Sequence, residues 1–174
     1  MAPKLSPSDL LLISKGDART INHFRLGARL AQLSGLGIDQ LSEAACRDRF
    51  RFAQETLRCA RWALYSAKPH YRVALARSYY AMYHTARSLV FFVQRGDDHE
   101  AHIELPKHLP KDLPSRDQWE NELKNARYER NRADYDPYPK SDAAFKTVAE
   151  ATLQTAEKFF PVAKSYLKNK GVIL

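Results

Sequence analysis

Apolar residues recur along two long stretches of the chain at three- and four-residue steps, the spacing of one helix face. The stretches are residues 39–66 and 70–95, and the second contains neither Gly nor Pro. The first has an apolar face of Leu41, Ala45, Phe52, Leu57, Ala60 and Leu64, and the second one of Tyr71, Leu75, Ser78, Tyr79, Met82, Ala86, Leu89, Val90 and Val93. Pro69 lies between them and is incompatible with a continuous helix. The pattern therefore predicts two long helices joined by a short connection.

Two further helices are expected in the second half of the chain. Ser115 can cap a helix over residues 116–134, whose apolar stripe begins with Trp119, Leu123 and Ala126. Ser141 or Asp142 can start the last helix, and its expected inner face is Ala144, Val148, Ala151, Thr155, Phe159, Ala163 and Leu167. Short connections between long helices favour antiparallel neighbours. The predicted fold is all-α, an up-and-down antiparallel bundle of four to five helices.

Residues 1–45 show a weaker pattern and are predicted to be a short helical N-terminal appendage to a bundle formed by residues 46–174. Ser8 and Asp17 are candidate caps for one or two short helices, and Gly35 and Gly37 end the pattern. The longest apolar run near the start, residues 10–13, is shorter than a secretory signal core or a membrane span. With only two cysteines, Cys46 and Cys59, we expect reduced thiols in a cytoplasmic protein without a membrane partner.

Residues 96–115 are expected to form a polar loop. The loop contains His99, His102 and His108 among the acidic residues Asp97, Asp98, Glu100 and Glu104. No spacing here matches a zinc pattern and no ligand pair is fixed on a helix, so we expect neither a metal site nor a cofactor.

Positive charge is concentrated in the middle of the chain. The formal net charge is +8, and residues 46–95 contain ten basic residues, nine of them Arg, against two acidic ones. Arginine suits bidentate contacts to phosphate. The distribution favours contact with a nucleic acid or nucleotide, although a solvated arginine-rich face would look the same.

The helix over residues 70–95 has a second, aromatic and basic side. Its members are Arg77, Tyr80, His84, Arg87 and Phe91, which follow one another at three- and four-residue steps. Such a face can contact a partner or ligand. Alternatively, Tyr80 and Phe91 pack against another helix of the bundle and His84 is a packing histidine.

The stripe that starts at Trp119 continues into charged residues. Arg127, Arg130 and Asp134 share that helix face and can hold a phosphate. The alternative is an Arg130–Asp134 ion pair, which contributes only a few tenths of a kcal/mol when exposed. A partly buried guanidinium must find acceptors, which favours a defined site around Arg130.

Two segments together resemble the HEPN family (higher eukaryotes and prokaryotes nucleotide-binding). Residues 77–89, Arg-Ser-Tyr-Tyr-Ala-Met-Tyr-His-Thr-Ala-Arg-Ser-Leu, are similar to the second-helix signature, and residues 130–135, Arg-Asn-Arg-Ala-Asp-Tyr, to the motif on the third long helix. The resemblance implies a dimeric bundle in which the arginine motifs of two protomers share a cleft. Many members are metal-independent endoribonucleases, often toxins of toxin–antitoxin or defence systems, and some pair with a small nucleotidyltransferase.

By this resemblance, Arg130 is the motif arginine and Asn131 the polar residue that follows it. The motif histidine is expected at 135–137, where this chain has Tyr135, Asp136 and Pro137 instead. Tyr135 can act as an acid or hydrogen-bond donor, and it resembles the tyrosine that partner nucleotidyltransferases modify. His84 is a candidate replacement for the missing base if its helix faces the same cleft.

Three hypotheses follow from these residues. The first is a dimeric ribonuclease or toxin-like effector with Arg130, Asn131 and Tyr135 as catalytic residues. Its nucleic-acid contacts would be Arg77, His84, Arg87, Arg127 and Asp134. The second is a non-catalytic module that binds RNA, a nucleotide or a nucleotidyltransferase. The third is a structural dimerisation bundle whose arginines only form ion pairs.

Overall fold

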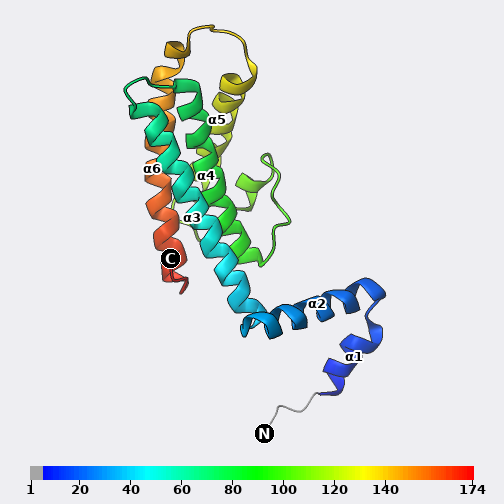
Figure 1. Cartoon of the computed structure of the whole chain (residues 1–174). Coiled ribbons are helices and arrows are strands. Elements are labelled where there is room, and N and C mark those ends of the chain that lie inside the picture. The colour runs from blue at the N-terminus through cyan, green and yellow to red at the C-terminus, as the bar shows by residue number, and fades with distance from the viewer. Residues whose placement is uncertain (1–5) are drawn as a thin grey trace. The chain divides into compact units, whose positions relative to one another are not determined.

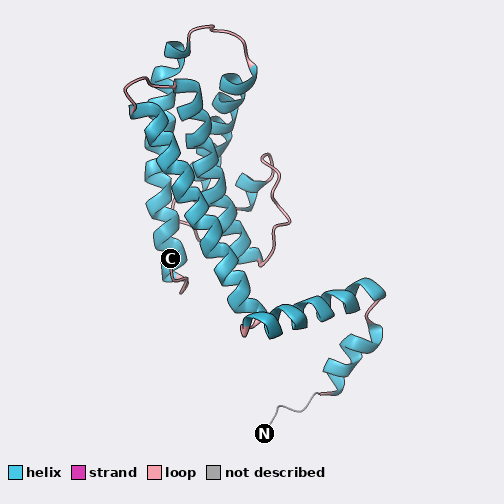
Figure 2. Ribbon diagram, in the orientation of Figure 1, coloured by secondary structure: helices cyan, strands magenta, loops and turns pink. Residues whose placement is uncertain are grey.

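A computed structural model describes residues 6–174, and these residues form helices and loops without any strand (Figures 1 and 2). Six α-helices are present in this range: α1 (Pro7–Lys15), α2 (Ala18–Ser34), α3 (Ile38–Tyr65), α4 (Tyr71–Gln94), α5 (Arg116–Tyr135) and α6 (Lys146–Asn169). Two short 3₁₀ helices, η1 (Leu105–His108) and η2 (Asp142–Phe145), precede α5 and α6. The predicted all-α class is therefore confirmed.

The chain divides into two compact units, Met1–Ser42 and Glu43–Leu174. Helix α3 crosses this division. Each unit is described separately below.

The first unit contains α1 and α2. Ser6, rather than the expected Ser8, caps α1, because its hydroxyl accepts from the Asp9 backbone N–H and the Asp9 carboxylate accepts from the Ser6 backbone N–H. Asp17 caps α2 as expected, with its carboxylate 2.8 Å from the Thr20 nitrogen, and Gly35 ends that helix in the left-handed conformation at φ 69°.

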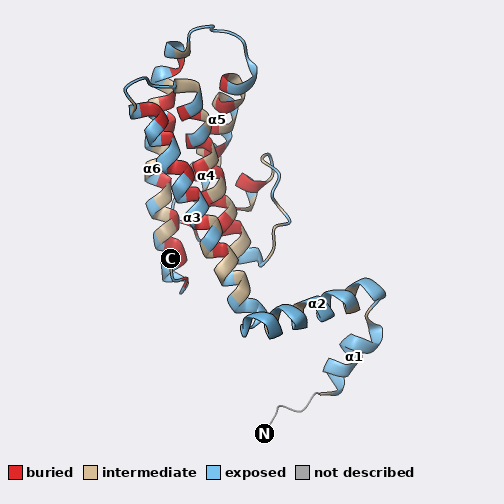
Figure 3. Cartoon of the chain, viewed as in Figure 1, coloured by how far each residue is buried: buried red, intermediate tan, exposed pale blue. Residues whose placement is uncertain are grey.

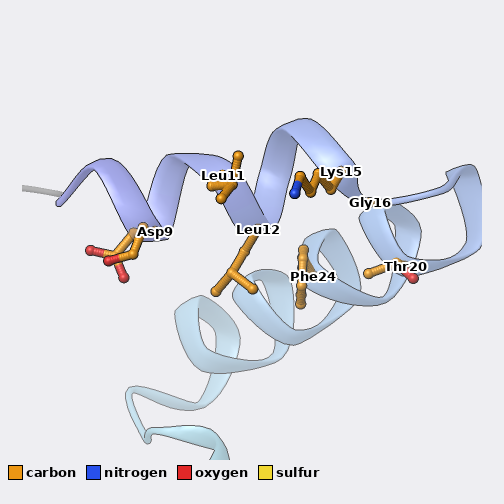
Figure 4. A pocket seen from close by; sticks show the side chains of 8 residues that line it. Asp9, Leu11, Leu12, Lys15, Gly16, Thr20 and Phe24 are labelled. Carbon is orange, nitrogen blue, oxygen red and sulfur yellow. The ribbon is translucent and has the colours of Figure 1, made fainter.

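Neither helix of the first unit buries a residue (Figure 3). Leu11, Leu12 and Phe24 lie along an open groove between α1 and α2 (Figure 4). A segment of this length rarely buries enough apolar surface for stable independent folding.

The second unit is an antiparallel bundle of α3 from Glu43 onward, α4, α5 and α6. Helix α4 packs against both α5 and α6, and α3 contacts α6 through the stacked rings of Phe50 and Phe160, 4.5 Å apart. The start of α3 lies beside the end of α4, where Cys46 Sγ is 3.4 Å from the Ser88 carbonyl oxygen. The buried residues form one core shared by these helices (Figure 3).

Several predicted core positions are wrong in detail. Phe52 and Val93 are 53% and 49% exposed, because each lies at the edge of its helix's apolar face. In α6 the expected stripe is correct only from Phe159 onward. Its first half buries Ala149, Thr152, Leu153 and Ala156 instead, because the helix presents a neighbouring face to α4.

The segment between α4 and α5 is not simply a polar loop. Leu105, Leu109 and Leu113 are buried, and η1 packs against α4 and α5. Ser115 directly precedes α5, but its side chain makes no capping hydrogen bond, so the expected cap is wrong. The buried leucines hold this segment, including His102, against α4.

Candidate functional site

Arg130 lies on the core-facing side of α5. The buried residues of this helix are Trp119, Leu123, Ala126, Arg130 and Ala133, which follow each other at three- and four-residue steps. Only 7% of Arg130 is exposed. A charged group in such a position is costly unless neighbouring groups compensate for the missing water, so its contacts define the site.

Three tyrosines surround the Arg130 guanidinium. Its central carbon lies 5.3, 4.9 and 5.8 Å from the ring centroids of Tyr79, Tyr80 and Tyr135. Nη2 donates to the Tyr80 hydroxyl at 2.5 Å, and Nη1 donates to Asn131 Oδ1 at 3.1 Å and to the Tyr135 hydroxyl at 3.4 Å. These contacts combine hydrogen bonding with cation–π attraction and compensate partly for burial.

One nitrogen of the guanidinium has no hydrogen-bond partner. Arg130 Nε is buried and makes no hydrogen bond, although Asp134 Oδ2 lies 3.5 Å away. The Arg130–Asp134 ion pair proposed from the sequence therefore exists as a charge contact at helical i, i+4 spacing. It leaves one N–H of the guanidinium unused.

Two histidines lie close to the same tyrosines. His102 Nδ1 is 2.5 Å from the Tyr79 hydroxyl, and its ring stacks on Tyr83 at 4.1 Å and meets Tyr80 edge-on at 5.9 Å. The rings of His84 and Tyr80 are 6.2 Å apart. Tyr79 and Tyr80 thus contact both Arg130 and His102, which places an imidazole in the neighbourhood of the motif arginine.

Burial keeps both imidazoles neutral near pH 7. Desolvation lowers the pKa of His84 to about 4, with smaller contributions from Arg87, His102 and Arg49. Desolvation also lowers the pKa of His102, and the positive charges of Arg130, Arg127 and Arg87 add to the effect. Burial raises the pKa of Tyr79, so this hydroxyl keeps its proton.

His102 was considered from the sequence only as a metal ligand. Its position beside Tyr79 depends on packing of the segment between α4 and α5, which spacing alone does not reveal. Among residues 6–174, no group of three or more His, Cys, Asp or Glu side chains is arranged to hold a metal ion.

The aromatic and basic side of α4 divides between two grooves. His84 and Arg87 line one groove with Arg49 and Phe52 from α3. Arg87 donates to Asp97 and Glu100, so carboxylates from the following loop compensate its charge.

The second groove lies beside Arg130 and the tyrosines that surround it. Arg72, Arg77, Tyr80 and Asp134 line it. Arg77 is exposed, and within the described part of the chain neither Arg77 nor Arg127 forms an ion pair. This groove therefore combines the unpaired positive charge of Arg77 with the side chain of Tyr80, the tyrosine that accepts from Arg130.

Arg72 fixes the segment that follows α5. Its guanidinium donates to the carbonyl oxygens of Ala133, Asp136 and Pro139 at 2.6, 3.0 and 2.7 Å, and it lies 4.1 Å over the Phe145 ring. These contacts hold the end of α5, and with it Tyr135, against α4.

The fold and the site together define a class of protein. It is an antiparallel helical bundle whose third long helix carries a buried arginine surrounded by tyrosines. The family model for the HEPN domain matches residues 46–166, and the chain belongs to this family. The predicted family is thus confirmed, and membership indicates an RNA-related or nucleotide-binding function. Comparisons with curated proteins and with solved structures gave no match.

No helix among the described residues is both long and apolar enough to cross a bilayer.

Proposed function

We propose that this protein binds RNA at the Arg130 site and cleaves it without a metal ion. The observation that carries the proposal is the caged Arg130 guanidinium, which retains an unused N–H and shares Tyr79 and Tyr80 with a neutral imidazole. A phosphodiester in the adjacent groove would also meet Arg77, whose charge is not compensated.

Cleavage begins with attack of the ribose 2′ oxygen on the adjacent phosphorus. The new 2′ O–P bond forms as the P–O5′ bond breaks, leaving a 2′,3′-cyclic phosphate. Arg130 stabilises the negative charge that develops on the phosphorane oxygens, and Asn131 orients the guanidinium. The Tyr135 hydroxyl is a hydrogen-bond donor to the leaving 5′ oxygen, which takes a proton from water.

His102 is the base of this scheme. When its proton is on Nδ1, that proton bonds to the Tyr79 oxygen and the Nε2 lone pair can accept the 2′-hydroxyl proton. The imidazolium then returns the proton to solvent, which its lowered pKa favours. His84, the alternative base proposed from the sequence, lines the other groove with Arg87 and takes no part in this scheme.

A second candidate function is binding of RNA or a nucleotide without cleavage. The absence of a histidine at 135–137 favours it. Asp134 next to Arg130 also reduces attraction for a phosphate. In this case the same Arg130 contact provides affinity alone.

Family membership adds two proposals about partners. A homodimer would bring the arginine motifs of two protomers together, which size-exclusion chromatography with light scattering tests. A nucleotidyltransferase antitoxin would modify Tyr135, whose side chain is 73% exposed. Mass spectrometry after coexpression with such an enzyme would detect the nucleotidyl group on Tyr135.

The deciding experiment incubates the protein with a mixed RNA pool in EDTA and measures 2′,3′-cyclic phosphate ends. We expect Arg130→Met, which keeps much of the buried volume, to reduce cleavage by about 100-fold or more, and His102→Gln to remove the neutral base without changing RNA affinity. Lys124→Met on the exposed side of α5 is the matched control.

Two outcomes would overturn the proposal. RNA binding that depends on Arg130 without any cleavage would establish the second candidate. Wild-type protein that neither cleaves nor binds RNA at low salt would refute both.

A further inference from the structure

The outward face of α3 carries aromatic and basic side chains in one line, all of them exposed except Arg47, which is half-buried. Arg47, Arg51, Arg58, Trp62 and Tyr65 are separated by four, seven, four and three residues, so they share one side of the helix. We refer to these five residues as the α3 track. It extends over about 27 Å at 1.5 Å per residue.

Trp62 and Tyr65 are each 69% exposed. Large aromatic side chains usually bury most of their surface in a core. The core side of α3 is instead occupied by Cys46, Ala53 and Ala60, each 0% exposed. Neither aromatic residue of the track is needed for packing, and both rings are available to a ligand.

The positive charge of the track is only weakly compensated. Asp48 lies 3.5 Å from Arg51 and Glu55 lies 3.9 Å from Arg58, and all four side chains are more than 60% exposed. Exposed pairs of this kind contribute little, and a polyanion can replace the carboxylates. The neighbouring Arg61 is held more closely, with Nε 2.6 Å from Glu157, and is not part of the track.

We propose that the α3 track binds a single strand of RNA outside the Arg130 site. Arg47, Arg51 and Arg58 contact phosphates, and bases stack on Trp62 and Tyr65. Arginine with exposed aromatic rings is the combination that binds single strands with little sequence preference. The inference rests on the proposed function, because it assigns a second contact for the same RNA.

The composition of this face argues against a protein partner. The exposed neighbours on this side of the helix include Gln54 and Glu55, and they do not form an aliphatic patch around the two rings. Protein interfaces are enriched in Met and aromatic residues as well as Arg, and their cores are more apolar and depleted of Glu and Lys, whereas polar and charged side chains surround the two rings here and no apolar centre forms. A polyanionic strand therefore matches the track better.

The first test measures binding of a fluorescein-labelled twelve-nucleotide oligouridine by anisotropy at low salt. Trp62→Leu keeps apolar bulk but removes the aromatic face, and we expect affinity to fall about tenfold, within the range for loss of one stacked base. Trp62→Phe should restore most of the affinity. Tyr138→Leu, an exposed tyrosine on the loop after α5, is the control.

The second test measures the salt dependence of binding. Arg51→Ala/Arg58→Ala should reduce the slope of log K against log salt by about 1.4, since each phosphate contact on a single strand contributes about 0.7. Lys111→Ala/Lys146→Ala removes the same charge from exposed positions on other elements and should leave the slope nearly unchanged.

The outcomes separate this inference from the proposed function. Loss of binding in Arg130→Met with normal affinity in both track variants would overturn the α3 track alone. Absence of RNA binding by the wild type would overturn both. A changed oligomeric state in Trp62→Leu with unchanged RNA affinity would make this face a protein interface and refute the inference.

Discussion

Arg72 connects the first turn of α4 to the segment after α5, and its replacement tests how the candidate site is held together. Arg72→Met removes three hydrogen bonds from a guanidinium to the carbonyl oxygens of Ala133, Asp136 and Pro139. The methionine retains an apolar contact with Phe145. Asp142 still accepts from the backbone N–H of residue 72, because that bond does not involve the side chain.

The expected destabilisation is about 3 kcal/mol. A hydrogen bond from a charged donor contributes about 1.5–3 kcal/mol, but the bonds to Asp136 and Pro139 are exposed and only the bond to Ala133 is partly buried. We therefore take about 1.5 kcal/mol for the bond to Ala133 and, because water reaches the other groups, about 0.5 kcal/mol for each exposed bond and for the cation–π attraction between Arg72 and the Phe145 ring.

Urea denaturation followed by circular dichroism measures this difference directly. The control is Arg77→Met on the same helix. Arg77 is exposed and has no ion-pair partner among the described residues, so its variant should change stability by less than about 0.5 kcal/mol. Equal stability of the two variants would refute the assignment of Arg72 as an anchor of the segment after α5.

Three other predictions concern capping, pH and thiol reactivity. Asp142→Ala should lower the free energy of unfolding by about 2 kcal/mol, because the Asp142 carboxylate accepts from the first two backbone N–H groups of α4 at 2.7 and 2.9 Å. Thermal unfolding measures the loss, and Ser141→Ala, which removes no cap, is the control. Stability should fall by about 2 kcal/mol, after allowance for solvent screening, as pH decreases from 6.5 to about 4. In this window the His84 side chain takes up a proton in the unfolded chain but not in the folded protein, because burial lowers its pKa to about 4. His84→Gln should make the free energy of unfolding, measured by urea denaturation, depend less on pH. An unchanged pH dependence would contradict the burial argument. Cys59 should react with a thiol reagent in the native state and Cys46 only after unfolding. The reason is that Cys46 is buried, and burial raises the pKa of its thiol to about 11. Rapid reaction of both thiols in the folded protein would contradict this prediction.

Local signals in the sequence were sufficient to predict the four long helices, although α6 begins at Lys146 and not at Ser141 or Asp142. The apolar period placed α3 and α4 within a residue or two of their observed ends, because Pro69 and the loss of periodicity after residue 95 are local features. Asp17 and Gly35 were correctly predicted as the residues at which α2 begins and ends, for the same reason.

The sequence was less informative at the edges of helix faces. Phe52 matched the apolar period but is exposed, and the first half of α6 turns a different face inward than expected. Which of two neighbouring faces is buried depends on the position of α4, and no local pattern contains that position.

The sequence alone determined that Arg130 continues a stripe that begins at Trp119, so that a charge had to lie near the core. Tertiary structure decided what surrounds it: Tyr80 from α4, and His102 from a segment held by buried leucines. It also decided that Arg87 is compensated by Asp97 and Glu100, whereas Arg77 is not. A helix period fixes the direction of a side chain relative to its own axis, but contacts between side chains 10 to 50 positions apart depend on how the segments pack.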